Sequence, residues 1–141
     1  MGNLGSLDNR TFKTSKTKRV MVDMSATIIH HGHIRILKAA KELGVVVVAL
    51  TADDEILKTK GYIPELIYSE REEILLAIKY VNEVVKSKWL IDDEFLDKHN
   101  IDLLVHGHDN SNPIRKERLV IIPRTEGISS RLIRKSHKFI E

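Results

Sequence analysis

Six consecutive apolar residues, Val45 to Leu50, constrain the fold of this chain more than any other segment. The run lies between Gly44 and Thr51 and is rich in β-branched side chains, which favour strands. It is much too short to cross a membrane, for which a helix needs about 20 apolar residues. A strand that is apolar throughout is typical of a parallel sheet covered on both faces. The segment therefore predicts a buried strand of an α/β fold.

Strand-like and helix-like patterns alternate along the rest of the chain, which is typical of a parallel sheet covered by helices. A first helix, ended by Gly44, is indicated by an apolar face at helical spacing that consists of Ile34, Leu37 and Ala40, with Leu43 as a candidate fourth member. The capping pattern Ser69-Glu70-Arg71-Glu72 predicts that another helix begins there. The other expected elements are strands at 19–25, 83–85, 101–106 and 119–122, and helices at 92–99 and from Ser129 onward.

These patterns predict a Rossmann-like α/β fold, in which a parallel sheet has helices on both faces. A chain of 141 residues suffices for a single domain with a substantial core, and we place this domain at 19–141. In such sheets ligands bind beyond the carboxyl ends of the strands. The segments just after each strand are therefore the candidates for a functional site.

Composition excludes several classes of protein. The sequence has no cysteine, so disulfides and thiolate metal sites are excluded and a reducing, cytoplasmic location is expected. It is 42% hydrophobic but has no long uncharged apolar run, which excludes a membrane span. The N-terminal residues lack the apolar core of a signal peptide, and we expect no export.

Residues 1–18 form a basic segment with little apolar patterning. They contain Arg10 and three lysines against the single acid Asp8, while the formal net charge of the whole chain is only +3. Such a composition predicts a disordered tail. A nucleic-acid-binding arm is the alternative, but Phe12 is the only aromatic residue of the segment that could stack on a base, so we expect no nucleic-acid partner.

The segment His30-His31-Gly32-His33 follows the first predicted strand and opens the first predicted helix. Backbone N–H groups in the first turn of a helix have no partner within the helix, and they favour a bound anion. Gly32 leaves room for a phosphate, and His30 and His33 can donate hydrogen bonds to phosphoryl oxygens. Taken alone, the motif also fits a polar helix start with solvated imidazoles.

A second segment of this kind, Arg124-Thr125-Glu126-Gly127-Ile128-Ser129-Ser130, follows the predicted strand 119–122. Arg124 offers a planar fork for phosphate, and Gly127 with the two serines offers a turn, a helix N-cap and hydroxyl donors. A simple helix-capping loop is the alternative. Two anion-binding helix starts in one small α/β domain favour a site for nucleotide phosphates.

With both segments, the chain resembles the cytidylyltransferase family of the HxGH nucleotidyltransferase superfamily, whose small members include the glycerol-3-phosphate cytidylyltransferases. The resemblance extends from Arg19 to Arg134 and includes the order of elements. The R-T-E-G-I-S-[ST] form is more typical of enzymes that use CTP than of adenylyl-transferring relatives. The resemblance implies transfer of CMP from CTP to a small phosphorylated alcohol, such as glycerol-3-phosphate or a related polyol phosphate, with release of pyrophosphate and formation of a CDP-activated product.

The resemblance also implies roles for individual residues. The catalytic residues would be His30, His33, Lys58, Arg124 and Ser129. The nucleotide would contact Ser25, Ala26, His30, Gly32, His33, Gly107, Asp109, Arg124, Thr125, Gly127, Ile128, Ser129 and Ser130. The acceptor would contact Lys58, Lys60, Arg71, Trp89 and His108.

Several of these positions have a structural interpretation as well. Lys58 and Lys60 are expected in a loop after the strand 44–51, where an ammonium group could close over the reacting phosphate, or could simply be solvated. Arg71 would otherwise be a charge on a helix surface, and Trp89 a half-buried aromatic residue. The sequence leaves these alternatives open.

This chain departs from the family's pattern in two segments. Where the family has Gly-Thr-Phe-Asp, this chain has Met24-Ser25-Ala26-Thr27, and His108 stands where an aspartate is usual. The segment Met24-Ser25-Ala26 resembles the corresponding segment of cytidylyltransferase-like domains associated with phosphonate metabolism. The departures leave open another phosphorylated or phosphonate acceptor, or a protein that binds nucleotide without turning it over.

The implied reaction is direct in-line attack of an acceptor oxygen on the α-phosphorus, without a covalent enzyme intermediate. Mg²⁺ would travel with CTP, because this ion usually keeps waters and substrate phosphates as ligands. We expect no resident metal: His30, His31 and His33 would make a poor zinc site, since no acidic partner is nearby in the sequence. Relatives are commonly dimers, which implies a homodimer.

Overall fold

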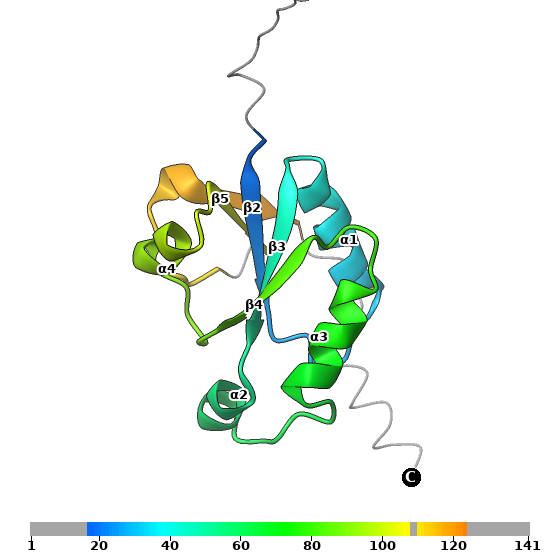
Figure 1. The fold of residues 1–141 in the computed structure, drawn as a ribbon. Helices are drawn as coiled ribbons and strands as arrows, with labels where there is room; N and C mark the ends of the chain where they lie inside the picture. The colour runs from blue at the N-terminus through cyan, green and yellow to red at the C-terminus, as the bar shows by residue number, and fades with distance from the viewer. Residues whose placement is uncertain (1–16, 108–109, 124–141) are drawn as a thin grey trace, which may run out of the picture.

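The computed structural model describes residues 17–107 and 110–123. Its centre is a five-stranded sheet of order β4-β3-β2-β5-β6, in which all neighbouring strands are parallel (Figure 1). The strands are β2 (Arg19–Met24), β3 (Val45–Thr51), β4 (Glu83–Ser87), β5 (Leu103–Gly107) and β6 (Leu119–Ile122). The helices are α1 (His31–Lys41), α2 (Asp53–Lys60), α3 (Tyr68–Leu76) and α4 (Asp93–Lys98), with a 3-10 helix η2 (Lys116–Arg118).

Helices cover both faces of this sheet. On one face, Leu37 of α1 and Leu75 of α3 pack against alternate residues of β2, β3 and β5. On the other face, Leu96 of α4 packs with the residues of the same strands that point the opposite way. Strand β3 is consequently buried on both sides from Val46 to Leu50. The predicted Rossmann-like class is confirmed.

Strand β2 lies in the middle of the sheet, with Val22 opposite both Val48 of β3 and Val105 of β5. Because all the strands are parallel, their carboxyl ends share one edge. At this edge β3 leads into α2, and the turn 25–30 leads from β2 into α1 (Figure 1). The H-H-G-H segment therefore begins α1 at the edge where ligands bind in such folds.

The prediction about the segment after β3 was wrong, and the candidate residue Leu43 lies outside the apolar face of α1. Lys58 and Lys60 lie in the last turn of α2 and not in a loop. Three acids in the first turn and two lysines in the last complement the helix dipole, which was the overlooked helix signal. Leu43 lies beyond the end of α1 and is 39% exposed, so it is not part of the apolar face of that helix.

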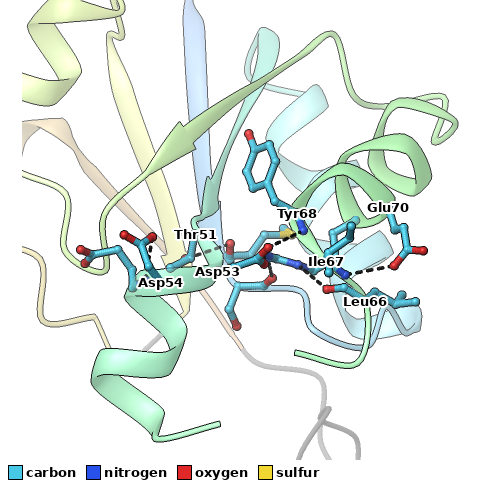
Figure 2. A network of polar contacts seen from close by, with 11 residues as sticks. Thr51, Asp53, Asp54, Leu66, Ile67, Tyr68 and Glu70 are labelled. Carbon is cyan, nitrogen blue, oxygen red and sulfur yellow. Dashed lines mark hydrogen bonds and ion pairs between the residues drawn. The ribbon is translucent and has the colours of Figure 1, made fainter. Parts of the chain in front are cut away.

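Helix α3 begins at Tyr68. The predicted cap by Ser69 is wrong, because Ser69 already lies within the helix. The Tyr68 N–H donates instead to Oδ2 of Asp53, at 3.0 Å, and the Ile67 N–H donates to Oε1 of Glu70, at 3.0 Å (Figure 2). A carboxylate from α2 thus replaces the local hydroxyl cap. The helix predicted at 92–99 is α4, and Asp92 caps it by accepting from the Phe95 N–H at 2.9 Å.

Four strands differ from their predicted bounds, β2 and β3 by one residue only, since β2 ends at Met24 and β3 begins at Val45. Strand β4 continues to Ser87, and β5 begins at Leu103 and ends at Gly107. The predicted tail 1–18 lies outside the described residues except for its last two, and so does the helix predicted from Ser129. Within the described ranges, no helix has the length and apolarity that a bilayer crossing requires.

Gly44 joins α1 to β3 at a close approach to the start of β2. An added Cβ would overlap the carbonyl oxygen of Lys18, which also accepts the Val45 N–H at 2.9 Å. We expect Gly44→Ala to lower the free energy of unfolding by about 3 kcal/mol, because the backbone must shift. Urea unfolding measures this loss.

Gly61→Ala provides the control for that experiment. An added Cβ at Gly61 meets nothing within 4 Å, but its φ of +81° is strained for alanine. We expect a loss of only about 1 kcal/mol there. A loss at Gly44 that is no larger than the loss at Gly61 would contradict the overlap.

Candidate active site

The turn after β2 holds an alanine in a left-handed conformation. Ala26 has φ +48° and is buried, and this conformation costs a non-glycine residue about 1–2 kcal/mol. Such a conformation persists only where neighbouring groups hold it. The Thr51 hydroxyl donates to the Met24 carbonyl at 3.3 Å, which anchors the start of the turn to β3.

His30 and His33 are joined to the start of α1 by reciprocal hydrogen bonds. Nδ1 of His30 accepts from the Gly32 N–H at 3.1 Å, and Nδ1 of His33 accepts from the His30 N–H at 3.1 Å. Two histidines thus form a capping box, which serine or threonine and glutamate usually form. Their ring centroids are 4.1 Å apart. The structure therefore brings together the two histidines singled out in the sequence.

These bonds determine which nitrogen of each ring carries the proton. An Nδ1 atom that accepts a hydrogen bond has no proton, so the neutral ring is protonated at Nε2. Burial and the neighbouring His30 lower the pKa of His33 to about 4. Burial and the neighbouring His31 also lower the pKa of His30. Near pH 7 both imidazoles are consequently neutral, and each has an Nε2–H that can donate to a ligand oxygen.

The buried side chain of Arg71 ties this turn to α2 and α3. Nη1 donates to the Ser25 carbonyl at 2.6 Å, Nε donates to the Leu66 carbonyl at 3.0 Å, and Nη2 lies 2.5 Å from Oδ1 of Asp53. Figure 2 shows Asp53 within this network, between α2 and the start of α3. The predicted contact of Arg71 with an acceptor would require the guanidinium to leave these partners.

Three predicted acceptor-binding residues gather around Glu55 of α2. Its Oε1 accepts the Trp89 N–H at 2.9 Å, and its Oε2 lies 3.4 Å from Nζ of Lys58. The hydrogen bond from Trp89 is the main reason that the pKa of Glu55 is lowered. Nζ of Lys60 lies 5.4 Å from the centroid of the Trp89 ring. The structure therefore brings Lys58, Lys60 and Trp89 together, while their contact with an acceptor stays a prediction.

A second polar network, missed in the sequence, lies at the carboxyl ends of β2 and β5. Nδ1 of His106 is 2.5 Å from Oδ1 of Asp23, a distance at which an imidazole N–H donates to a carboxylate. Nδ2 of Asn112 donates to Oδ2 of Asp23 at 3.0 Å. Asp23 and His106 are polar residues near the carboxyl ends of two mostly apolar strands, and the parallel register places them side by side. A polar residue near the end of each strand was the sequence signal that could have indicated this network.

The other predicted site residues are only partly placed. Gly107 ends β5, next to His106 and opposite Ile122 of β6. Outside the described residues lie His108, Asp109, Arg124, Thr125, Gly127, Ile128, Ser129 and Ser130. Their predicted roles therefore stay predictions. The described part offers a pair of neutral donors at the start of α1, and lysines on α2, the next helix along the chain.

A comparison with models of protein families shows to which family the chain belongs. The family model described as cytidylyltransferase-like matches residues 25–136, which include the H-H-G-H and R-T-E-G-I-S-S segments. The chain belongs to the cytidylyltransferase-like family. It is by family a nucleotidyltransferase, as its two sequence motifs predicted.

Curated relatives of two kinds match this cytidylyltransferase-like chain. It is 33% identical over 125 residues to a glycerol-3-phosphate cytidylyltransferase of Staphylococcus aureus, covering 83% of this chain and 92% of the relative. The Bacillus subtilis enzyme of that name is 35% identical over 122 residues, covering 83% and 95%. An ethanolamine-phosphate cytidylyltransferase of Dictyostelium discoideum is 36% identical over 132 residues, covering 85% of this chain but only 36% of the relative.

A solved structure supports the fold of the cytidylyltransferase-like chain. The lipopolysaccharide core biosynthesis protein from Thermoplasma volcanium superposes with a TM-score of 0.66, at 21% identity, over 79% of this chain and the whole of that protein. At this identity the likeness concerns the fold alone. Among the described residues, no group of three or more histidines, cysteines or acids is arranged to hold a metal ion.

Proposed function

We propose that this chain transfers CMP from CTP to glycerol-3-phosphate or a related polyol phosphate. The observation that carries the proposal is the His30–His33 pair, whose backbone hydrogen bonds leave two neutral Nε2–H donors at the start of α1. A polyol phosphate acceptor is supported by the extent of the matches. The chain spans 92% of a glycerol-3-phosphate enzyme but 36% of an ethanolamine-phosphate enzyme.

In the proposed reaction an oxygen of the acceptor phosphate forms a bond to the α-phosphorus of CTP. The bond from this phosphorus to the oxygen that bridges to the β-phosphate breaks, and pyrophosphate leaves with that oxygen. The acceptor is already an anion at neutral pH, so no base is needed to activate it. Catalysis then consists of positioning the two phosphates and stabilising the charge that develops between them.

His30 and His33 would donate to the phosphoryl oxygens of the triphosphate. Neutral imidazoles suit this task, because they donate through Nε2–H without requiring protonation at pH 7. Lys58, whose side chain is 74% exposed on α2, would bridge acceptor and α-phosphate. Arg124 and Ser129 would hold the β- and γ-phosphates. Mg²⁺ would enter with its substrate as MgCTP, and homodimerisation and a cytoplasmic location stay predictions.

Pyrophosphate release tests the proposed function. We expect release from MgCTP, and none above background from MgATP, when glycerol-3-phosphate or another polyol phosphate is added. Phosphoethanolamine, phosphocholine and aminoalkylphosphonates complete the acceptor panel. Release with one of these alone would replace the polyol by that acceptor, and release with ATP would replace the nucleotide. Silence across the panel, with measurable CTP binding, would favour a non-catalytic nucleotide-binding protein.

A further inference from the structure

We propose that Arg71 is a positioning residue, which holds the turn at Ser25 and Ala26 in its binding conformation without touching either substrate. The inference rests on the proposed function, because it assigns Arg71 an effect on the nucleotide side of that site. It replaces the direct acceptor contact that the sequence suggested for this arginine. Three features of the structure carry it.

The first feature is the burial of the guanidinium. Arg71 has no exposed surface, and its three nitrogens bond to three separate segments: the turn after β2, the segment before α3, and α2. A buried arginine is tolerated because Asp53 balances its charge and two carbonyls accept its remaining bonds. A side chain in this position can influence a ligand only through the groups that it holds.

The second feature is the strained turn that Arg71 holds. The two carbonyls that precede Ala26 both accept side-chain hydrogen bonds, that of Met24 from Thr51 and that of Ser25 from Arg71. In a trans peptide the N–H points opposite to the carbonyl, so the Ala26 N–H points away from Arg71. Within the described ranges this buried N–H has no acceptor. Arg71 therefore sets the direction of a main-chain donor at the proposed nucleotide site.

The third feature is the connection to α2. Asp53 is the first residue of α2, and its two carboxylate oxygens bind the Arg71 guanidinium and the first N–H of α3. The same helix carries Lys58 near its end. One ion pair thus fixes the turn, α2 and α3 relative to one another. The turn at Ala26 and the lysine on α2 are consequently held in a single arrangement.

Arg71→Lys tests this inference, with Arg118→Lys as the matched control. Lysine keeps the positive charge beside Asp53 but cannot reach three segments with a planar fork. We expect kcat/KM for CTP to fall by at least about 10-fold in Arg71→Lys, while KM for the acceptor changes by less than about 2-fold. Asp53→Asn, which removes the charge and leaves one accepting oxygen where Arg71 and the Tyr68 N–H now use two, should lower kcat/KM for CTP in the same direction.

Arg118 makes the same kinds of bonds away from the site. It donates to the Ile101 carbonyl at 2.6 Å and to Oδ1 of Asp97 at 2.8 Å. We expect Arg118→Lys to lower the melting temperature about as much as Arg71→Lys does, with unchanged kcat/KM for CTP. Equal kinetics in the two variants, measured well below both melting temperatures, would reduce Arg71 to a structural role and overturn the inference. A higher acceptor KM with unchanged CTP kinetics would restore the direct acceptor contact.

Hydrogen exchange separates this inference from the proposed function. If wild-type protein releases no pyrophosphate with any acceptor, the proposed function fails, and the inference is judged on the exchange of a peptide covering residues 23–30. We expect this peptide to exchange faster in Arg71→Lys than in wild type or Arg118→Lys. An unchanged exchange rate would show that Arg71 does not hold the turn.

Discussion

His30→Asn is expected to reduce kcat about 100- to 1000-fold, while the Kd for CTP changes by less than about 3-fold. Asparagine is a favoured N-cap residue, and its Oδ1 can accept the Gly32 N–H that Nδ1 of His30 accepts now. The variant therefore keeps the start of α1 and loses only the Nε2–H donor. A donor that acts mainly on the transition state affects turnover far more than nucleotide affinity. Pyrophosphate release and calorimetric titration with CTP measure the two quantities.

His31→Asn is the control for this prediction. His31 is the exposed first residue of α1, next to the capping histidine. We expect its replacement to leave both kcat and CTP affinity unchanged. An equal loss of kcat in His30→Asn and His31→Asn would contradict a specific role for the Nε2–H donor of His30. A weaker CTP affinity in His30→Asn that accounts for the whole loss of activity would assign His30 to ground-state binding.

The second large effect concerns pH, because the pKa of His33 is lowered to about 4 in the folded chain. In the unfolded chain it is near its ordinary value of 6.5. Between these values the unfolded state binds more protons, so stability rises with pH. The contribution is complete above pH 6.5 and is lost as the pH falls toward 4. From the size of the shift we expect a loss of about 3 kcal/mol, and the lowered pKa of His30 acts in the same direction.

Urea unfolding of wild type and His33→Gln between pH 7 and pH 4 measures this loss. Glutamine does not titrate, and its Nε2 occupies a position similar to that of the imidazole Nε2. The difference in unfolding free energy between the two proteins isolates His33 from the carboxylates that titrate in the same range. We expect this difference to shift by about 3 kcal/mol in favour of the variant as the pH falls. A difference that is independent of pH would mean that protonation of His33 does not oppose folding.

Patterns within one element predicted most of the fold. The apolar run from Val45 to Leu50 identified β3, and apolar spacing with the H-H-G-H segment identified α1, because each signal is contained in a few neighbouring residues. The predictions failed where a distant residue intervenes. Ser69 does not cap α3, since Asp53 of another helix binds the first N–H of that helix. The sequence predicts a loop at Lys58 and Lys60 because α2 has few apolar residues, and the helix signal there is the order of its charges.

In the candidate site, too, contacts between neighbouring residues could be predicted and contacts between distant residues could not. His30 and His33 could be found because they are three residues apart, and their hydrogen bonds lie within one helical turn. The burial of Arg71 could not be found, because its partners Asp53 and Ser25 are 18 and 46 residues away. The Asp23–His106 pair spans 83 residues and becomes visible only when the register of two parallel strands is known.

The bond between Arg71 and Ser25 also has a consequence for synthesis of the chain. The H-H-G-H segment leaves the ribosome well before Arg71, which follows Ser25 by 46 residues. Until α3 has been made and packed on the sheet, Arg71 cannot bind the Ser25 carbonyl. The left-handed conformation of Ala26 then lacks the hydrogen bond that stabilises it. A nascent chain that ends before α3 therefore presents both histidines without the turn that accompanies them. A phosphorylated ligand that needs this turn would accordingly bind and stabilise only chains in which α3 has already packed on the sheet.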